Sequence, residues 1–439
     1  MTPDHQEPGL PETEHSHTYN FYNKFQNYVC PVDPDWEPDI PFTVNVTSHI
    51  SWNDTQLQDV LFKDRLNVIW VPMHKPTWQW FNDFYPDAWR DLEILADPYS
   101  EFPTAVVWDY NNETLFPGNF DPKDDATVDI LKDKDFREFY CSTLSWDRQN
   151  IVDKIGFRQI ISNYSGMGGL AIFNTFTEDP SLQHGYKGME IGKKYPIRYF
   201  CPNNVFRPNR AMGIVKMHHK GMLDDTEWSM NKFSQWHEMD RFIQEHDLDF
   251  ISYVKEYFEL FGKTPRQMSF PWNKEYNIDR INQDRGDHSM KHKAWYDAFP
   301  RSLMDKIYIY IAQQTVSSKS TEEPINPLKP IHVGDWDEKI LKGFIYGKPT
   351  FINGRAGTLQ ILEDLGFDML RDYNIHDYDN EQDDIVRIDK MLDCAINFPK
   401  PNKDIQARLE HNNRLVRSKK FWWDSQSNLI KILLDNHAR

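Results

Sequence analysis

Short apolar runs separated by polar segments organise the first half of the chain and predict buried strands. Four of these runs lie at residues 66–71, 104–108, 139–144 and 170–173, bounded by proline, asparagine and aspartate. Runs of this length between breakers are typical of strands in an α/β sheet. Residues 1–40 differ, because they are rich in proline and acidic side chains and predict a flexible acidic lead-in.

Strand-like and helix-like patterns alternate in the second half. Strands are expected at 197–200, at 306–312, where isoleucines and tyrosines alternate, and at 350–352. Apolar residues at helical spacing recur at 211–218, 249–261, 340–345, 358–365, 405–416 and 421–434. Thr358 is available as an N-cap, and Gly366 is placed to end that helix. This alternation implies a parallel sheet covered on both faces, in which ligands bind beyond the carboxyl ends of the strands.

Length and terminal pattern limit the organisation of the chain. At 439 residues the chain exceeds the roughly 250 to 300 residues at which a single core stops growing, so two domains are expected. We expect an N-terminal α/β domain at 41–195, a C-terminal α/β domain at 196–400 and C-terminal helices at 401–439. The N-terminus does not resemble a secretory signal, and no apolar stretch reaches the roughly 18 to 20 residues of a membrane span. A soluble, cytoplasmic protein is expected.

Cysteine spacing and net charge exclude further classes. The four cysteines lie far apart without C-x-x-C spacing, so structural zinc is not expected. D-x-D patterns at 247–249 and 335–337 match the way some enzymes hold a divalent metal, but such matches arise by chance among 67 acidic residues, and no metal site is expected. A formal net charge of -17 argues against a broad nucleic-acid surface and leaves a local basic groove open.

Basic side chains gather in two segments against this acidic balance. Residues 191–223 carry seven lysines and arginines and no acidic side chain, in the order strand, Pro/Asn/Arg loop and helix. A helix N-terminus favours an anion, and Arg207 and Arg210 add guanidinium groups that fit phosphate oxygens. The second segment, after Glu338, holds Lys339, Lys342, Lys348 and Arg355. Either segment alone could reflect ordinary placement of basic residues, whereas both in one domain favour phosphate binding.

Three side chains in the N-terminal half are candidates for a general base. Asp109 and Glu113 come after the apolar run 104–108, and His74 follows the run 66–71. A carboxylate or an imidazole placed after a strand can take a proton from a reacting hydroxyl group. The alternative for each of them is a structural role, as a helix cap, a turn residue or a surface group.

The order of short motifs in the second half resembles that of glycosyltransferases of tailed phages and bacteria. The loop FCPNNVFRPNR at 200–210 is followed by a helix that closes on KGMLDD. Later motifs of that family have counterparts in IAQQT, DEK, KPTF, GTL and LGF, at 311–315, 337–339, 348–351, 357–359 and 365–367. The resemblance covers about residues 196–400 and rests on the order and spacing of these motifs. The DEK helix start is also similar to the donor site of fucosyltransferase-like and exostosin-like enzymes.

The resemblance implies the GT-B architecture, in which two Rossmann-like domains with parallel sheets face each other across a deep interdomain cleft. The C-terminal domain is then expected to hold a nucleotide diphosphate sugar as the donor substrate, with no further cofactor. The N-terminal domain is expected to hold the acceptor, and the C-terminal helices to pack back on it. By motif position, Glu338 meets ribose or sugar hydroxyls. The remaining donor-binding candidates are Asn203, Arg207, Arg210, Lys339, Lys342 and Arg355.

The implied activity is metal-independent transfer of a sugar to an acceptor hydroxyl group. The phage members suggest a DNA modification in the host cytoplasm, with a hydroxymethylated pyrimidine as acceptor, because a flipped base needs only a local groove. Glycan, lipid-linked and protein acceptors are alternatives. Gln314 stands where the family usually has glutamate, so a contact that requires a carboxylate is lost. This departure motivates the alternative of a catalytically silent relative that binds a sugar or acts in a structural interaction.

Overall fold

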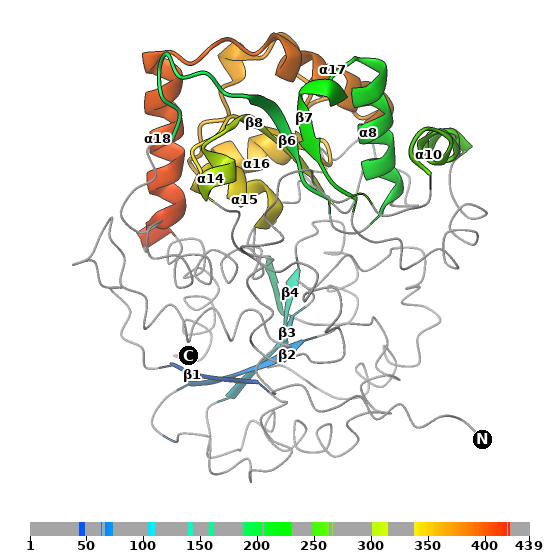
Figure 1. The fold of residues 1–439 in the computed structure, drawn as a ribbon. Helices are drawn as coiled ribbons and strands as arrows, with labels where there is room; N and C mark the ends of the chain where they lie inside the picture. The colour runs from blue at the N-terminus through cyan, green and yellow to red at the C-terminus, as the bar shows by residue number, and fades with distance from the viewer. Residues whose placement is uncertain are drawn as a thin grey trace.

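The computed structural model describes residues 44–48, 63, 66–72, 104–109, 139–143, 158–161, 188–203, 206–230, 248–262, 266, 301–314, 338–418 and 420–421. These residues form two parallel β-sheets and a set of helices (Figure 1). The described part of the chain therefore belongs to the α/β class, as the alternation of apolar runs predicts.

The first sheet has five strands that lie in chain order. They are β1 (Val44–Ser48), β2 (Leu66–Pro72), β3 (Thr104–Asp109), β4 (Phe139–Thr143) and β5 (Arg158–Ile161). Every neighbouring pair is parallel, so none of these strands forms a hairpin with the next. The three predicted strands that begin at residues 66, 104 and 139 are confirmed, whereas the one predicted at 170–173 lies outside the described residues.

The second sheet has four parallel strands, and their order in space differs from their order in the chain. The strands β6 (Ile197–Cys201), β7 (Thr226–Trp228), β8 (Ile307–Gln313) and β9 (Thr350–Asn353) lie in the order β7-β6-β8-β9. The chain passes from β6 to β7 on one side and from β8 to β9 on the other. The direction of winding therefore reverses between β6 and β8, and in open α/β sheets ligands bind at such a reversal, beyond the carboxyl ends of the strands.

Helices alternate with these strands, as predicted. The helix α8 (Pro208–His219) follows β6, α15 (Glu338–Ile345) precedes β9, and α16 (Thr358–Asp364) follows β9. The other helical segments are α10 (Leu248–Phe261), α14 (Arg301–Met304), α17 (Asp384–Asn397), α18 (Lys403–Arg417), η6 (Leu223–Asp225) and η9 (Arg371–Tyr373). None of the helices in the described ranges has the length and apolar character needed to cross a membrane.

The helices α8 and α15 cover opposite faces of the second sheet (Figure 1). Gly213 of α8 lies against the side chain of Gln313, whereas Gly343 of α15 lies against Tyr310. Side chains alternate between the two faces along a strand, so residues three apart point to opposite sides. Every residue of β8 is buried in consequence, the tyrosines as well as the isoleucines.

The helix α18 packs on α15. The side-chain amide of Asn413 donates a hydrogen bond to the main-chain oxygen of Phe344 (3.1 Å). Phe367 stacks on Phe344 with 4.5 Å between ring centroids, and Phe421 meets Phe367 edge-on. The expected packing of 401–439 on the N-terminal domain stays a prediction, because the chain after Phe421 lies outside the described residues.

Candidate functional site at the carboxyl edge of the second sheet

Buried carboxamide side chains lie at the edge where β6, β8 and β9 end. Asn203 follows β6, Gln313 ends β8, Gln314 comes directly after it, and Asn353 ends β9. Each of these side chains is at most 2% exposed. Burying an amide is unfavourable unless it is hydrogen-bonded, so the partners of these groups define the site.

A chain of polar contacts crosses the three strands and reaches α8. Asn203 Nδ2 donates to Cys201 O (3.3 Å), and Gln313 Nε2 donates to Cys201 Sγ (2.9 Å). Gln313 Oε1 accepts from Asn353 Nδ2 (2.9 Å), which also donates to Asn209 O in the first turn of α8 (3.3 Å). Side-chain amides therefore join the edge of the sheet to the start of α8.

Gln314 belongs to the same edge. Its main-chain oxygen accepts a hydrogen bond from Asn209 Nδ2 (2.9 Å), and its main-chain N–H donates to Asn353 O (3.0 Å). Its side chain lies against Gly354, where an added Cβ would come within 1.6 Å of Gln314 Oε1. A residue other than glycine at 354 would therefore displace the side chain of Gln314.

The start of α8 is electropositive. Arg207 is the N-cap, with extended backbone (φ -142°, ψ 148°) and no side-chain cap hydrogen bond within the described structure, and Pro208 follows at the first helical position. No acidic residue lies in the first turn, where the N–H groups and the helix dipole favour negative charge. Arg207 is half-buried and Arg210 is 3% exposed, so two guanidinium groups accompany this helix end. The arrangement suits an anion.

Cys201 lies within the carboxamide network but is poorly suited to act as a nucleophile. Burial raises the pKa of the Cys201 thiol to about 11, although hydrogen bonds from Gln313 and Asn203 and the charge of Arg210 act in the opposite direction. The thiol is therefore protonated at neutral pH, and the thiolate is the reactive form. The effect of Arg210 on this thiol also places its positive charge close to the end of β6.

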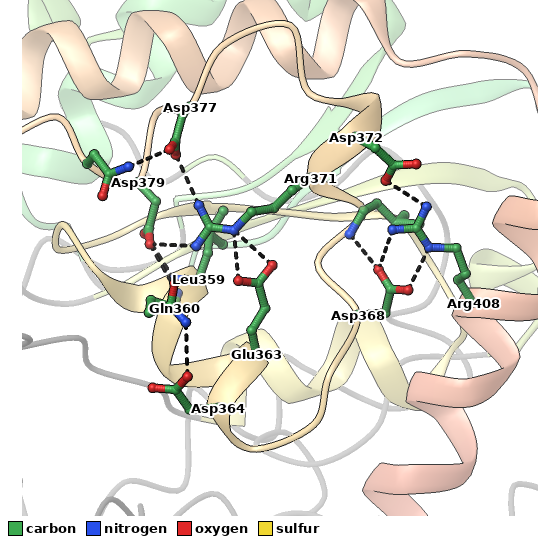
Figure 2. A network of polar contacts seen from close by, with 12 residues as sticks. Leu359, Gln360, Glu363, Asp364, Asp368, Arg371, Asp372, Asp377, Asp379 and Arg408 are labelled. Atoms are coloured by element: carbon green, nitrogen blue, oxygen red, sulfur yellow. Dashed lines mark hydrogen bonds and ion pairs between the residues drawn. The ribbon is translucent and has the colours of Figure 1, made fainter.

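The N-terminus of α16 is occupied by a carboxylate from the chain itself (Figure 2). Asp379 accepts hydrogen bonds from the N–H groups of Leu359 (2.9 Å) and Gln360 (3.0 Å), and Arg371 Nη2 donates to it at 3.2 Å. Burial raises the pKa of Asp379 in spite of these donors. The end of α16 therefore has its negative charge built in.

The prediction of Thr358 as N-cap of this helix was wrong. Gly357 is the N-cap, in the left-handed conformation (φ 82°), and Thr358 is the first helical residue. The Thr358 hydroxyl donates instead to Arg355 O (2.8 Å). The carboxylate of Asp379 takes the place of a local cap, from a residue 20 positions beyond Leu359. A local sequence pattern does not reveal a cap supplied from another loop.

The remaining donor-binding candidates are spread along α15 and the loop after β9. Glu338 begins α15, but its side chain lies outside the described structure, and Lys339 is half-buried in the first turn. Lys342 is buried in the last turn of α15, the turn that contacts Thr350 at the start of β9. Arg355 follows β9 and is 9% exposed. Arg355 therefore lies near the carboxyl edge, whereas Lys342 lies toward the amino end of β9.

Of the candidates for a general base, Asp109 belongs to the first sheet. Asp109 is the last residue of β3, and its backbone is paired with Ser142 of β4. The placement after a strand agrees with the position expected for Asp109, and its side chain lies outside the described structure. His74 and Glu113 lie outside the described residues altogether.

Three residues of the network are not predicted as site residues from the sequence. Asn209, Gln313 and Asn353 are buried and bonded to one another or to neighbouring strand ends. The available signal was a polar residue placed directly at the end of an apolar strand or inside the first turn of a helix. Within the described ranges, no three histidine, cysteine, aspartate or glutamate side chains gather so that they could hold a metal ion.

The second sheet and its polar carboxyl edge define an α/β unit that is compatible with a Rossmann-like domain. Its site combines an electropositive helix end with neutral hydrogen-bonding groups. Comparison of the chain with known protein families and with curated proteins finds no match.

Proposed function

We propose that the chain is a glycosyltransferase of GT-B architecture, which transfers a sugar from a nucleotide diphosphate donor to an acceptor hydroxyl group. The observation that carries the proposal is the start of α8, where Arg207 and Arg210 accompany an acid-free first turn beside the reversal between β6 and β8. The order of motifs along residues 196–400 supports it. In this proposal the second sheet belongs to the donor-binding domain, and the first sheet to a facing acceptor domain.

The proposed reaction needs positive charge where the leaving group forms. The acceptor oxygen bonds to the anomeric carbon, while the bond from that carbon to the β-phosphate oxygen breaks and a nucleoside diphosphate leaves. Negative charge grows on the β-phosphate, and preorganised donors stabilise it without reorganising. Arg207, Arg210 and the first-turn N–H groups of α8 are the groups that we assign to this role, with Lys339 at the start of α15 as a further cation.

The acceptor hydroxyl must lose its proton to a base if the configuration at the anomeric carbon is inverted. We assign this role to Asp109, because a residue at the carboxyl end of β3 lies at the edge of a parallel sheet where ligands bind. Glu113 and His74 remain candidates for the same role. The acceptor that we propose to test first is a hydroxymethylated pyrimidine in DNA, with glycan, lipid-linked and protein acceptors as comparisons.

A second candidate function is a catalytically silent sugar-binding or interaction protein. Gln314 favours it, because its neutral side chain is 1% exposed at the carboxyl edge, where the family pattern has a carboxylate. A silent relative is expected to bind the nucleotide donor without hydrolysing or transferring it, or not to bind it at all. The two functions therefore differ in turnover rather than in fold.

Calorimetric titration of the full chain with nucleoside diphosphates and nucleotide sugars tests the proposed function. One diphosphate is expected to bind, and Arg207→Ala is expected to weaken it about 10- to 100-fold, since a charged hydrogen bond contributes about 1.5–3 kcal/mol. Arg414→Ala is the matched control, because Arg414 is an exposed arginine on α18, a helix that contributes no residue to the carboxyl edge site. No binding across the panel, or equal losses in the two variants, would contradict the proposal.

A further inference from the structure

Two asparagine side chains at the carboxyl edge have a fixed orientation. Asn353 Nδ2 faces two acceptors, Gln313 Oε1 and Asn209 O. Asn203 Nδ2 faces the main-chain oxygen of Cys201. Exchanging oxygen and nitrogen in either amide would bring an acceptor against an acceptor, so the hydrogen-bond network assigns both amides. In each asparagine, the side-chain N–H groups therefore donate to protein acceptors, and the side-chain oxygen points away from those acceptors.

These two oxygens are buried without a hydrogen-bond partner in the described structure. Asn203 Oδ1 and Asn353 Oδ1 both belong to side chains that are 2% exposed. A buried acceptor without a donor costs free energy relative to the hydrated amide, so each oxygen favours a molecule that brings a donor. The loss of hydration has already occurred at these oxygens, which makes a new hydrogen bond there more favourable than at an exposed amide.

The position of the oxygens relates them to the phosphate-binding end of α8. The Asn353 amide reaches Asn209 O inside the first turn of that helix. Asn203 lies on the loop that leads into α8 and shares Cys201 with Arg210, whose charge acts on the thiol. A phosphate bound at the first turn of α8 would therefore lie near the side chains of both asparagines.

Neutral acceptors select a definite chemistry. A carboxamide oxygen accepts from hydroxyl or N–H groups and repels phosphate oxygens, whereas the arginines and N–H groups of α8 do the opposite. We propose that Asn203 and Asn353 form a hydroxyl-binding subsite for a phosphorylated polyol, the ribose of a nucleoside diphosphate. This inference rests on the proposed donor site at α8. It assigns the ribose to Asn203, after β6, and Asn353, at the end of β9, rather than to Glu338.

Burial of the two asparagine oxygens affects the rate at which a ligand binds. Neither oxygen is open to solvent, so a ligand hydroxyl reaches it only after neighbouring groups shift. Association that requires such a change is slower than association with a site that is already open. We expect ribonucleotides to associate more slowly than inorganic pyrophosphate, which needs only the helix end.

The test compares three ligands with the full chain by isothermal titration calorimetry. The ligands are the ribonucleoside diphosphate that binds best, its 2′,3′-dideoxy counterpart and pyrophosphate. The ribonucleotide is expected to bind at least about tenfold more tightly than the dideoxy compound, as for one or two neutral hydrogen bonds. Asn353→Leu and Asn203→Leu are each expected to reduce this preference while leaving the affinity for pyrophosphate within about twofold.

A third variant separates the subsite from the general effect of removing a buried amide. In Asn412 both side-chain atoms are bonded to the main chain of Asp368, and the residue lies on α18. Asn412→Leu is expected to lower stability and to keep the full preference for the ribonucleotide. Pyrophosphate binds only the N-terminal end of α8 in this proposal. A variant that is partly unfolded therefore loses affinity for pyrophosphate, whereas a variant that lacks only the hydroxyl subsite keeps it.

The outcomes divide the two proposals. Equal affinity for the ribo and dideoxy compounds in the wild-type chain overturns the ribose subsite and leaves the donor site standing. A nucleotide sugar, titrated as a fourth ligand, provides a further outcome. If it binds more tightly than the nucleoside diphosphate and both asparagine variants abolish that difference, the assignment to ribose is overturned and the oxygens are assigned to hydroxyls of the transferred sugar. Absence of binding by nucleoside diphosphates and pyrophosphate overturns both proposals.

Discussion

Lys348 is a lysine with no exposed surface, at the amino end of β9. Its Nζ donates to Ile307 O (2.8 Å) and lies 5.1 Å from the centroid of the Tyr195 ring. Burial lowers the pKa of Lys348 to about 7; the nearby charges are Asp305 and Glu190, which raise it, and Lys193, which lowers it further. The sequence placed this lysine in a basic segment suited to phosphate, whereas the structure gives it an interior position.

The lowered pKa predicts how stability changes with pH. Between about 7 and 10.5 the unfolded chain holds a proton at Lys348 that the folded chain has released, so the free energy of unfolding rises with pH over this range. The slope approaches about 1.4 kcal/mol per pH unit for one full proton. Lys348→Met is expected to remove this rise, as measured by denaturant unfolding from pH 7 to 10.

Lys400→Met is the matched control for this measurement, because Lys400 is exposed after α17. That variant is expected to keep the wild-type dependence on pH. Parallel pH profiles for Lys348→Met and the wild-type chain would show that the amine is charged inside the folded protein or that the site opens to water.

At the scale of a single element, α16 depends on a distant carboxylate. Arg371 Nε donates to both oxygens of Glu363 at 2.8 Å and its two other nitrogens reach Asp377 and Asp379, which ties the loop after α16 to the helix (Figure 2). Asp379, which is bound by Arg371, also accepts hydrogen bonds from the N–H groups of the first turn of α16. The helix has only seven residues, so its own hydrogen bonds cannot hold it in isolation.

Asp379→Ala is therefore expected to lower the free energy of unfolding by about 1–3 kcal/mol, since it removes a cap and leaves buried donors unpaired. Asp377→Ala removes a second carboxylate from the same arginine, but Asp377 is 53% exposed, so the expected loss is under about 1 kcal/mol. Denaturant unfolding of both variants compares the two. Similar losses would mean that the ion pair with Arg371, rather than the cap, stabilises α16.

The whole molecule carries a net charge of -17, which bears on the proposed acceptor. If modified DNA is the acceptor, binding must occur at a local basic groove, and counterion release makes it weaken steeply as salt rises. Transfer to DNA is then expected to fall at least about tenfold between 50 and 200 mM salt, even with a few phosphate contacts. Transfer to a neutral glycan measured over the same range is expected to change little, and a flat profile with DNA would contradict a backbone-binding groove.

The sequence predicted the α/β class and most strands that have a continuous apolar run, since burial on both faces leaves that pattern in the chain. It missed β7, whose three residues include Thr226 and Glu227, because so short a strand leaves no periodic signal. Asn203 and Gln314 were singled out from the sequence, but the contacts that join them to the rest of the carboxamide network were missed for another reason. Asn203 and Asn353 are brought near Gln313 only by the order of strands β6, β8 and β9, which local patterns do not encode.

The two helix ends at this edge differ in where their anion comes from. At α16 the carboxylate of Asp379 is tethered to the chain, so its effective concentration at the helix end is fixed by the loop and is on the order of millimolar or more. The first turn of α8 has no acidic residue of its own. Under the proposed function, the fraction of α8 ends that hold an anion follows the concentration of the nucleotide sugar in the cell. The fraction of α16 ends that hold one does not, so only the helix end at α8 responds to metabolic supply.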